Sequence, residues 1–356
     1  MKLIPTGIES FKTMIDKNAY YIDKTNLIGE VLKEQVVLYT RPRRFGKTLN
    51  MSMLYYFFSN KEQENAYLFN GLNISKNDEA LKHQNKYPVI LISLKEMKND
   101  TFEEQINTFK DIVKNIVLQN KELLDSSYVD ESDQMILQDF KFLKSSFNQL
   151  KYSLKTISRC LHNHYHQQVI ILIDEYDVPL QAAYQHNYYD EMVEFLRSVF
   201  SSSLKTNDAL EKGIMTGCLR ISKESIFTGL NNFTSYSILN NIGNEYFGFT
   251  EKEVLQLLKD YQLSSYTSEV KEWYDGYLFG NIEIYNPWST LMYVKNKIQD
   301  QSFRPISFWA NTSGNDLVVN YIQNGSDELH EEFEQLIQGK SLTKYIKPEL
   351  TYREMD

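Results

Sequence analysis

Short, wholly apolar runs alternate with longer stretches of helical periodicity through the first 245 residues of the chain. A wholly apolar run predicts a strand covered on both faces, because a half-exposed strand would alternate apolar and polar positions. Such strands, separated by helices, are typical of an α/β fold with a mainly parallel sheet between two helical layers. The expected strands occupy residues 36–39, 88–94, 169–173, 213–216 and 236–239.

Helices are expected in the intervals between these strands. Thr101 precedes Glu104 by three positions, which is the spacing of a capping box and predicts a helix that begins at residue 102. Apolar residues then recur at the three- and four-residue spacing of one helix face. Further helical patterns cover residues 48–58, 150–161 and 192–200.

The pattern changes near residue 248, where helix and hairpin signals replace the strand runs. These signals are a second capping box at Thr250 and Glu253, a hairpin turn at Gly280-Asn281 and a helix start at Asn286-Pro287. We therefore expect an α/β domain over residues 1–245 and a smaller, mainly helical domain over 246–345. A winged-helix-like lid is one interpretation of the second domain, and residues 346–356 would form a tail leading to a missing C-terminal region.

The loop after the first expected strand has the residue types that bind phosphate. Phosphate binding requires backbone N–H groups that converge at a helix N-terminus, and a cation for the outer phosphates. Gly46, Lys47 and Thr48 match the end of the pattern G-x-x-x-x-G-K-[ST], whereas Arg41 replaces its first glycine. We expect a nucleotide to contact Arg41, Pro42, Arg43, Arg44, Phe45, Gly46, Lys47, Thr48 and Leu49.

Each residue that matches the pattern has an expected role in a P-loop. Gly46 would let the backbone approach the phosphates, Lys47 would reach the β and γ phosphates, and the Thr48 hydroxyl would bind Mg²⁺. A basic surface turn is the alternative, because so short a pattern also arises by chance. The strand before the loop and the helix after it favour the phosphate loop.

A pair of carboxylates, Asp174 and Glu175, ends the third apolar run. In P-loop enzymes a carboxylate at this place orients Mg²⁺, and an adjacent Glu can polarise the attacking water. A solvated acidic turn is the alternative, but the order of the two signals favours a Mg·ATP site with Thr48 and Asp174 as metal ligands. The strand expected at 88–94 fits the P-loop subclass with an inserted strand between the two Walker motifs.

Composition and charge narrow the classes of function. Hydrophobic residues make up 42% of the 356 residues, which is enough for a packed core. The formal charge of −9 argues against a general nucleic-acid coat, although one local basic patch remains open. Two cysteines without metal spacing, the lack of a secretory segment and the lack of an apolar run of about 20 residues predict a cytoplasmic protein without a membrane span.

The chain resembles the AAA-ATPase-like family, P-loop ATPases that often carry a C-terminal PD-(D/E)XK nuclease-like domain. The resemblance covers nearly the whole chain, and Arg41 at the first loop position is normal in that family. It implies ATP and Mg²⁺ as ligands and a nuclease-like region beginning about where this chain stops. Residues 246–356 contain no convincing Asp…Glu-x-Lys set of such a nuclease, so no nuclease activity is expected. The nearest match, Glu269-Val270-Lys271, is expected to be a solvated charge pair on a helix face. The residues that carry the resemblance are 21–25, 41–48, 87–89, 173–177, 216–220, 223–225, 229–232, 247–250, 273–277 and 285–287.

Three further positions have two interpretations each. Thr216 resembles the sensor position that contacts the γ-phosphate or the water, or it is a strand-end hydroxyl that caps a turn. Arg220 could stabilise transition-state charge or form a structural ion pair. Asp23 and Lys24 precede the first strand, where they would contact base or ribose or form a plain salt bridge. We include Thr216 and Arg220 with Lys47 and Glu175 in the expected catalytic set.

An ATPase that works as a nucleotide-driven switch is the function these observations favour. The alternative is a nucleotide-occupied scaffold with little turnover, and Glu175 favours turnover because a pure binder does not need it. Self-association or a protein partner remains open. Direct nucleic-acid handling has only the short arginine cluster in its favour, and the overall charge opposes it.

Overall fold

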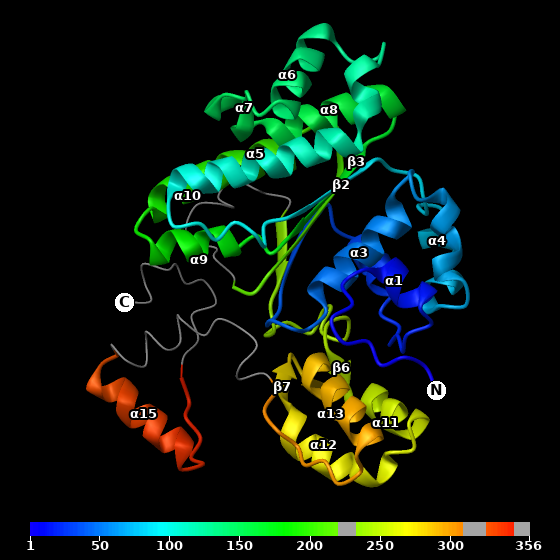
Figure 1. Cartoon of the computed structure of the whole chain (residues 1–356), viewed down its shortest axis with the longest axis vertical. Coiled ribbons are helices and arrows are strands. Elements are labelled where there is room, and N and C mark those ends of the chain that lie inside the picture. The colour runs from blue at the N-terminus through cyan, green and yellow to red at the C-terminus, as the bar shows by residue number, and fades with distance from the viewer. Residues whose placement is uncertain (220–232, 309–324, 345–356) are drawn as a thin grey trace.

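The computed structural model describes residues 1–219, 233–308 and 325–344 (Figure 1). Within these ranges five strands form one parallel sheet, in the order β2-β3-β4-β1-β5. The expected α/β fold with a mainly parallel sheet is therefore confirmed. The strands are β1 (Val36–Thr40), β2 (Val89–Ser93), β3 (Val169–Asp174), β4 (Leu210–Gly217) and β5 (Phe233–Tyr236).

The strand order brings the phosphate loop and the acidic strand end close together. β4 lies between β1 and β3, with Thr216 opposite Tyr39 of β1 and Met215 opposite Ile173 of β3. β2, which lies between the two motifs in the sequence, pairs with β3 alone. The carboxyl ends of β1, β4 and β3 are therefore neighbours at one edge, where open α/β sheets bind their ligands.

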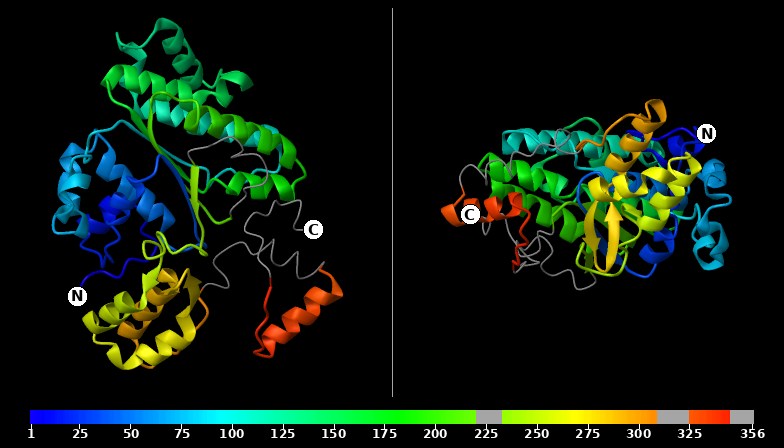
Figure 2. Two further views of the ribbon diagram at one scale, coloured as in Figure 1. Left: turned by 180° about the vertical axis from the view of Figure 1, so that it is seen from behind. Right: turned by 90° about the horizontal axis from the view of Figure 1, so that it is seen from below.

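Alternate residues of the buried strands face two separate helical layers. Val36 and Leu38 of β1 pack in the cluster formed with α5 (Phe102–Gln119), α8 (Ser153–Tyr165) and α10 (Tyr189–Leu204). Val37 and Tyr39 pack in the cluster formed with α1 (Phe11–Asp16) and α3 (Lys47–Phe58). Figure 1 shows α5 and α10 on one side of the sheet and α3 on the other, and Figure 2 shows the same layers from behind. This double coverage explains why the strand runs are wholly apolar.

The helices of the larger part of the chain begin near their sequence signals. Thr101 accepts a hydrogen bond from the backbone N–H of Glu104 and caps α5 as expected. The α-helices are α1 (Phe11–Asp16), α2 (Leu27–Val31), α3 (Lys47–Phe58), α4 (Asp78–Leu81), α5 (Phe102–Gln119), α6 (Glu131–Lys141), α7 (Phe147–Lys151), α8 (Ser153–Tyr165), α9 (Val178–Gln185) and α10 (Tyr189–Leu204). Short 3-10 helices are η1 (Gln63–Phe69), η2 (Asn73–Lys76) and η3 (Lys121–Asp125).

The last strand of the sheet lies earlier in the sequence than expected. β5 ends at Tyr236, whereas the apolar pattern predicted a strand over 236–239. The chain turns at Ser237, whose N–H and hydroxyl both donate to Oδ1 of Asn240. Leu239, which the pattern placed in the strand, is 54% exposed. The prediction was wrong here because a local side-chain turn overrides a short apolar run.

Residues 246–299, which we call the small module, contain three α-helices and a three-stranded antiparallel sheet in the order β6-β8-β7. Thr250 and Glu253 form a reciprocal capping box at the start of α11, and the hairpin turns at Gly280-Asn281 as expected. The winged-helix-like interpretation stays a prediction. The elements are β6 (Phe249–Thr250), α11 (Glu251–Asp260), η4 (Ser264–Tyr266), α12 (Thr267–Tyr274), β7 (Asp275–Phe279), β8 (Ile282–Tyr285) and α13 (Pro287–Gln299).

The N-terminal segment packs against the small module. Ile4 belongs to the apolar cluster of that module, and the rings of Tyr20 and Tyr261 lie 5.4 Å apart. The hydroxyl of Tyr261 donates to the carbonyl of Lys2 at 2.8 Å. One more helix, α15 (Asp327–Ile337), follows farther along the chain. None of the helices in the described ranges is long and apolar enough to cross a bilayer.

Candidate functional site

The expected phosphate loop crosses the carboxyl edge of the sheet. β1 ends at Thr40 and α3 begins at Lys47, so the loop leads directly into a helix N-terminus. Gly46 has a φ of 82°, in the left-handed region that glycine adopts without steric cost. No described atom lies within 4 Å of where its Cβ would stand. Glycine is therefore needed for its backbone conformation, and the space beside it is free for the approach of an anion.

Lys47 is buried against its own loop. Its Nζ donates to the carbonyls of Arg41 and Pro42, each at 3.1 Å, and lies 3.3 Å from Sγ of Cys218. Hydrogen bonds from an ammonium group are stronger than those between neutral groups, so they hold the charge at the centre of the loop. An anionic oxygen would compete successfully with these carbonyls, because it adds a full opposite charge.

Asp174, at the end of β3, connects the sheet to α3, the helix that follows the phosphate loop. It ends β3 with 2% of its surface exposed, and both carboxylate oxygens accept hydrogen bonds from hydroxyl groups. Oδ2 accepts from Thr48 of α3 at 2.7 Å, and Oδ1 accepts from Thr216 of β4. Carboxylate and hydroxyl oxygens are the ligands that Mg²⁺ prefers. The donor set at Thr48 and Asp174 thus fits the cation that the sequence implied.

Glu175 adopts a strained backbone conformation beside this carboxylate. Its φ of 54° lies in the left-handed region, which costs a non-glycine residue about 1–2 kcal/mol. Burial raises the pKa of Glu175 above its usual value, although the charge of Lys47 opposes the shift. The side chain lines a cavity over the phosphate loop. A carboxylate with a raised pKa at the wall of a cavity has the properties of a general base.

A cavity of about 400 Å³ lies over the loop. Its walls come from the loop and Glu175, from the N-terminal segment at Tyr21 and Ile22, and from the small module at Phe249 and Trp288. This volume is within the range of small-molecule sites, which are about 300–1,000 Å³. The cavity therefore has the size for a nucleotide, and its walls away from the loop include apolar side chains such as Ile22, Phe249 and Trp288.

Basic side chains outnumber acidic ones in the lining of this cavity, although the chain as a whole is acidic. A polyanionic ligand would offset this local excess of positive charge. The basic lining residues are Lys24, Arg43, Arg44, Lys47, Lys95 and Lys98, and the acidic ones are Glu9 and Glu175.

The side chain of Arg41 lies away from the cavity, unlike the expectation that it serves phosphates. It is fully buried, and its guanidinium donates to backbone carbonyls instead: Nη1 to Thr40 and Tyr236, each at 2.8 Å, and Nη2 to Gly243 at 3.1 Å. These acceptors lie outside the loop, so only the backbone of Arg41 is at the phosphate site. The sequence gives no signal for this, because two of the three acceptors, Tyr236 and Gly243, are far away along the chain.

The other loop residues divide between the cavity and the surrounding elements. Arg43 donates to Oε1 of Gln181 at 3.1 Å, and the guanidinium carbon of Arg44 lies 4.6 Å from the centre of a Trp288 ring. Phe45 is buried against the small module. Pro42 contributes the carbonyl that Lys47 contacts, and Leu49 lines the cavity.

Asp177, the last residue of the 173–177 segment that carries the family resemblance, has a structural part in the site. It is 5% exposed, and Oδ2 accepts hydrogen bonds from the N–H groups of Cys218 at 2.9 Å and Leu219 at 3.0 Å. Burial raises its pKa, although Lys47 and the two N–H groups act in the opposite direction. Asp177 thereby fixes the segment that follows Thr216 and places Cys218 against Lys47. Arg220, the next residue after Leu219, lies outside the described residues, so its role stays a prediction.

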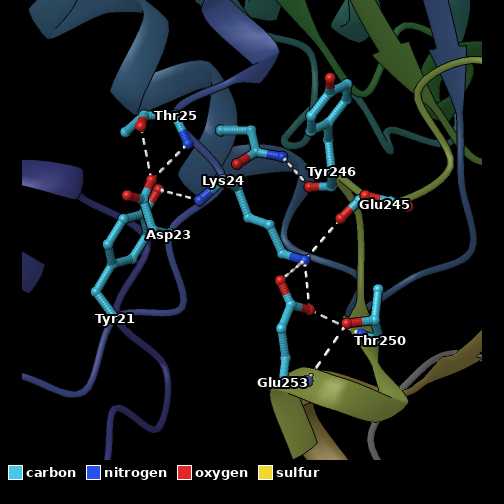
Figure 3. A network of polar contacts seen from close by, with 9 residues as sticks. Tyr21, Asp23, Lys24, Thr25, Glu245, Tyr246, Thr250 and Glu253 are labelled. Atoms are coloured by element: carbon cyan, nitrogen blue, oxygen red, sulfur yellow. Dashed lines mark hydrogen bonds and ion pairs between the residues drawn. The ribbon is translucent and has the colours of Figure 1, made fainter. Parts of the chain in front are cut away.

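Lys24 forms the structural salt bridge that was one of its two interpretations (Figure 3). Its Nζ is 2.7 Å from each carboxylate oxygen of Glu253 and 2.6 Å from the carbonyl of Glu245. Burial lowers the pKa of Lys24, and the Glu253 charge acts against this shift. Asp23 accepts from the N–H and hydroxyl of Thr25. The Lys24–Glu253 pair fastens the N-terminal segment to the small module at the edge of the cavity.

Comparison with known proteins gives one family and one relative. The family described as "Predicted AAA-ATPase" matches residues 5–227, which is more than half of the chain and contains the loop, Asp174 and Thr216. The "Uncharacterized protein in vnfD 5'region" of Azotobacter chroococcum mcd 1 is 25% identical over 325 residues. That match covers 90% of this chain and 56% of the relative, so the chain spans about half the length of that protein.

Proposed function

The chain belongs to the AAA-ATPase-like family, and we propose that it binds Mg·ATP over the loop at residues 41–49 and hydrolyses it. The observation that carries the proposal is the position of Asp174 between the hydroxyls of Thr48 and Thr216, with Glu175 at the wall of the adjoining cavity. An ordinary acidic turn would be solvated, whereas Asp174 is buried.

The residues of the loop would bind the phosphates. The N-terminus of α3 presents backbone N–H groups that have no partner within the helix, and these groups favour an anion. Nζ of Lys47 would exchange its two carbonyl acceptors, on Arg41 and Pro42, for phosphate oxygens. This exchange would need only a small movement of the side chain. Thr48 and Asp174 would hold Mg²⁺, which supplies charge neutralisation for the transferred phosphoryl group.

Glu175 would act on the attacking water. Its raised pKa makes it a stronger base than an exposed carboxylate, and its place at the cavity wall gives it access to a water molecule. Thr216 would position the same water or the γ-phosphate through a hydroxyl that now donates to Asp174. Arg220 would add positive charge in the transition state, its alternative being an ion pair.

ATP turnover would drive a switch in the arrangement of the chain or its partners. In this proposal residues 1–245 form the ATPase domain, residues 246–345 a second domain, and residues 346–356 a connection to a further region. The cavity supports such a link, because its walls come from both the loop and the small module. A ligand there contacts both parts of the chain.

Purified protein tests the proposal directly. We expect Mg²⁺-dependent release of phosphate from ATP, measured with and without DNA or RNA at a stated salt concentration. Tight ATP binding by calorimetry with no turnover above that of Asp174→Ala would favour the nucleotide-occupied scaffold instead. Absence of ATP binding in the presence of Mg²⁺ would refute both functions.

A further inference from the structure

Both ends of the phosphate loop contact the small module. At the start of the loop, the guanidinium carbon of Arg41 lies 5.2 Å from the ring centre of Phe247 and 5.4 Å from that of Phe279. Near its end, the ring of Phe45 lies 4.9 Å from Tyr277 and 5.3 Å from Phe279. One aromatic residue of the hairpin, Phe279, therefore contacts both loop residues.

Phe45 packs so closely against the small module that Gly248 has no space for a side chain. The N–H of Gly248 donates to the carbonyl of Phe45 at 3.2 Å. A Cβ on Gly248 would stand 2.8 Å from the Phe45 ring and 2.3 Å from Ile284. The positive φ of Gly248, 88°, is a second reason for glycine at this position.

Arg41 carries a buried charge that is held by hydrogen bonds to backbone carbonyls. No carboxylate of the described residues forms an ion pair with it. Its three carbonyl bonds and aromatic neighbours compensate for part of its lost hydration, while Nε has no hydrogen-bond partner among the described residues. Burial lowers the pKa of Arg41 to about 10, so the guanidinium stays charged at neutral pH. A fixed planar fork suits three carbonyls on different segments, whereas a lysine could not reach all of them.

The backbone of the same residue lies at the phosphate site. The carbonyl of Arg41 accepts a hydrogen bond from Nζ of Lys47 at 3.1 Å, and its N–H donates to the carbonyl of Gly217 at 3.0 Å. The guanidinium of the same residue lies beside Phe247 and Phe279 of the small module. Arg41 is thus the one residue of the loop with its backbone on Lys47 and its side chain against the small module, among the residues that the structure describes.

We propose that Arg41 is a positioning residue that couples the phosphate loop to the small module, so that the two move as one body when nucleotide binds. This rests on the proposed function for its ligand, and it deepens that function by naming the path from nucleotide to module. The small module then follows the movement of the phosphate loop and does not close over the loop independently. A glycine at position 41, as in the general pattern, would leave phosphate binding possible and weaken the coupling.

Hydrogen exchange of the full chain tests the coupling. In the parent, ATP with Mg²⁺ should slow exchange of the amides in the β7–β8 hairpin by about fivefold or more, the lower end of usual coupling strengths. In Arg41→Ala this slowing becomes much smaller, since only the Phe45 contacts still join the loop to the small module. ATP binds more weakly by the factor by which the slowing is reduced, because coupling is reciprocal. Arg159→Lys, a substitution of an arginine far from the loop, should behave as the parent.

Arg41→Lys serves if Arg41→Ala does not fold, since it keeps the charge and loses the fork. A folded Arg41 variant in which ATP still protects the hairpin as in the parent would overturn the proposal. The same experiment without nucleotide tests the coupling separately from the proposed ATPase function. Without ATP, β1 and the hairpin should exchange together in the parent, and the hairpin alone should exchange faster in Arg41→Lys. If β1 and the hairpin exchange alike in both proteins, the coupling is refuted, whereas a parent that binds no ATP refutes the ATPase.

Discussion

The hydroxyl of Thr48 donates a hydrogen bond to Oδ2 of Asp174 at 2.7 Å, across 126 positions of sequence. The contact joins the first turn of α3, which follows β1 and the loop, to the end of β3. In the sheet, β4 lies between β1 and β3. The contact places a hydroxyl and a carboxylate where one small cation can contact both. The predictions below depend on this geometry and on the two residues that flank it, Lys47 and Glu175.

Lys47→Ala should weaken Mg·ATP binding by at least about thirtyfold, the equivalent of ~2 kcal/mol for truncating one partner of a buried charge interaction. The fold should persist, because within the described part of the chain Nζ hydrogen-bonds to two carbonyls and Cys218 alone. Calorimetry gives the affinity and circular dichroism the Tm. Lys82→Ala, at an exposed lysine far from the loop, is the control. Equal ATP affinity in Lys47→Ala and the control would remove Lys47 from the phosphate site.

Glu175→Gln should bind Mg·ATP with nearly parental affinity and hydrolyse it at least about a hundredfold more slowly. The amide keeps the shape of the side chain and cannot accept the proton of the attacking water. Single-turnover phosphate release measures the effect. Glu79→Gln changes an exposed carboxylate in the same way and should leave the rate unchanged. Unaltered turnover in Glu175→Gln would direct attention to Asp177, two residues farther along the chain.

The rate of hydrolysis should fall as the solution is made mildly acidic. The midpoint of this fall should lie above about 4.3, the ordinary pKa of a glutamate side chain. Only the ionised form of Glu175 can accept a proton, and burial raises its pKa, so the active form is lost as pH falls through this raised value. A pH profile of kcat/KM would show the descending acid limb. The small residual rate of Glu175→Gln should lack that limb. The same limb in both proteins would assign it to another group.

Thr48→Ala should raise the Mg²⁺ concentration needed for half-maximal hydrolysis, whereas Thr48→Ser should stay close to the parent. Serine keeps the hydroxyl that contacts Asp174, and alanine removes one of the two oxygen donors and leaves Oδ2 without this partner. Magnesium titrations of ATP turnover compare the three proteins. Equal magnesium requirements for the alanine and serine variants would mean that Thr48 is not a ligand.

Local sequence patterns determined much of the sheet and the positions of the loop and the acidic pair. Strands β1 and β3 are apolar up to their last residues, Thr40 and Asp174, because both faces are covered, and that signal is contained in four or five neighbouring residues. The capping box at Thr250 and the hairpin turn at Gly280-Asn281 are equally local. Interactions within a few residues of one another are readable without the fold, because the chain itself fixes their distance.

The order of the strands and the direction of the Arg41 side chain came only from the tertiary structure. No local pattern tells that β4, and not β2, lies between β1 and β3, because parallel strands pair through long connections. The Arg41 guanidinium finds its acceptors at Tyr236 and Gly243, 195 and 202 positions away. A buried charge takes the place where enough acceptors converge, and that convergence exists only once distant segments have packed together.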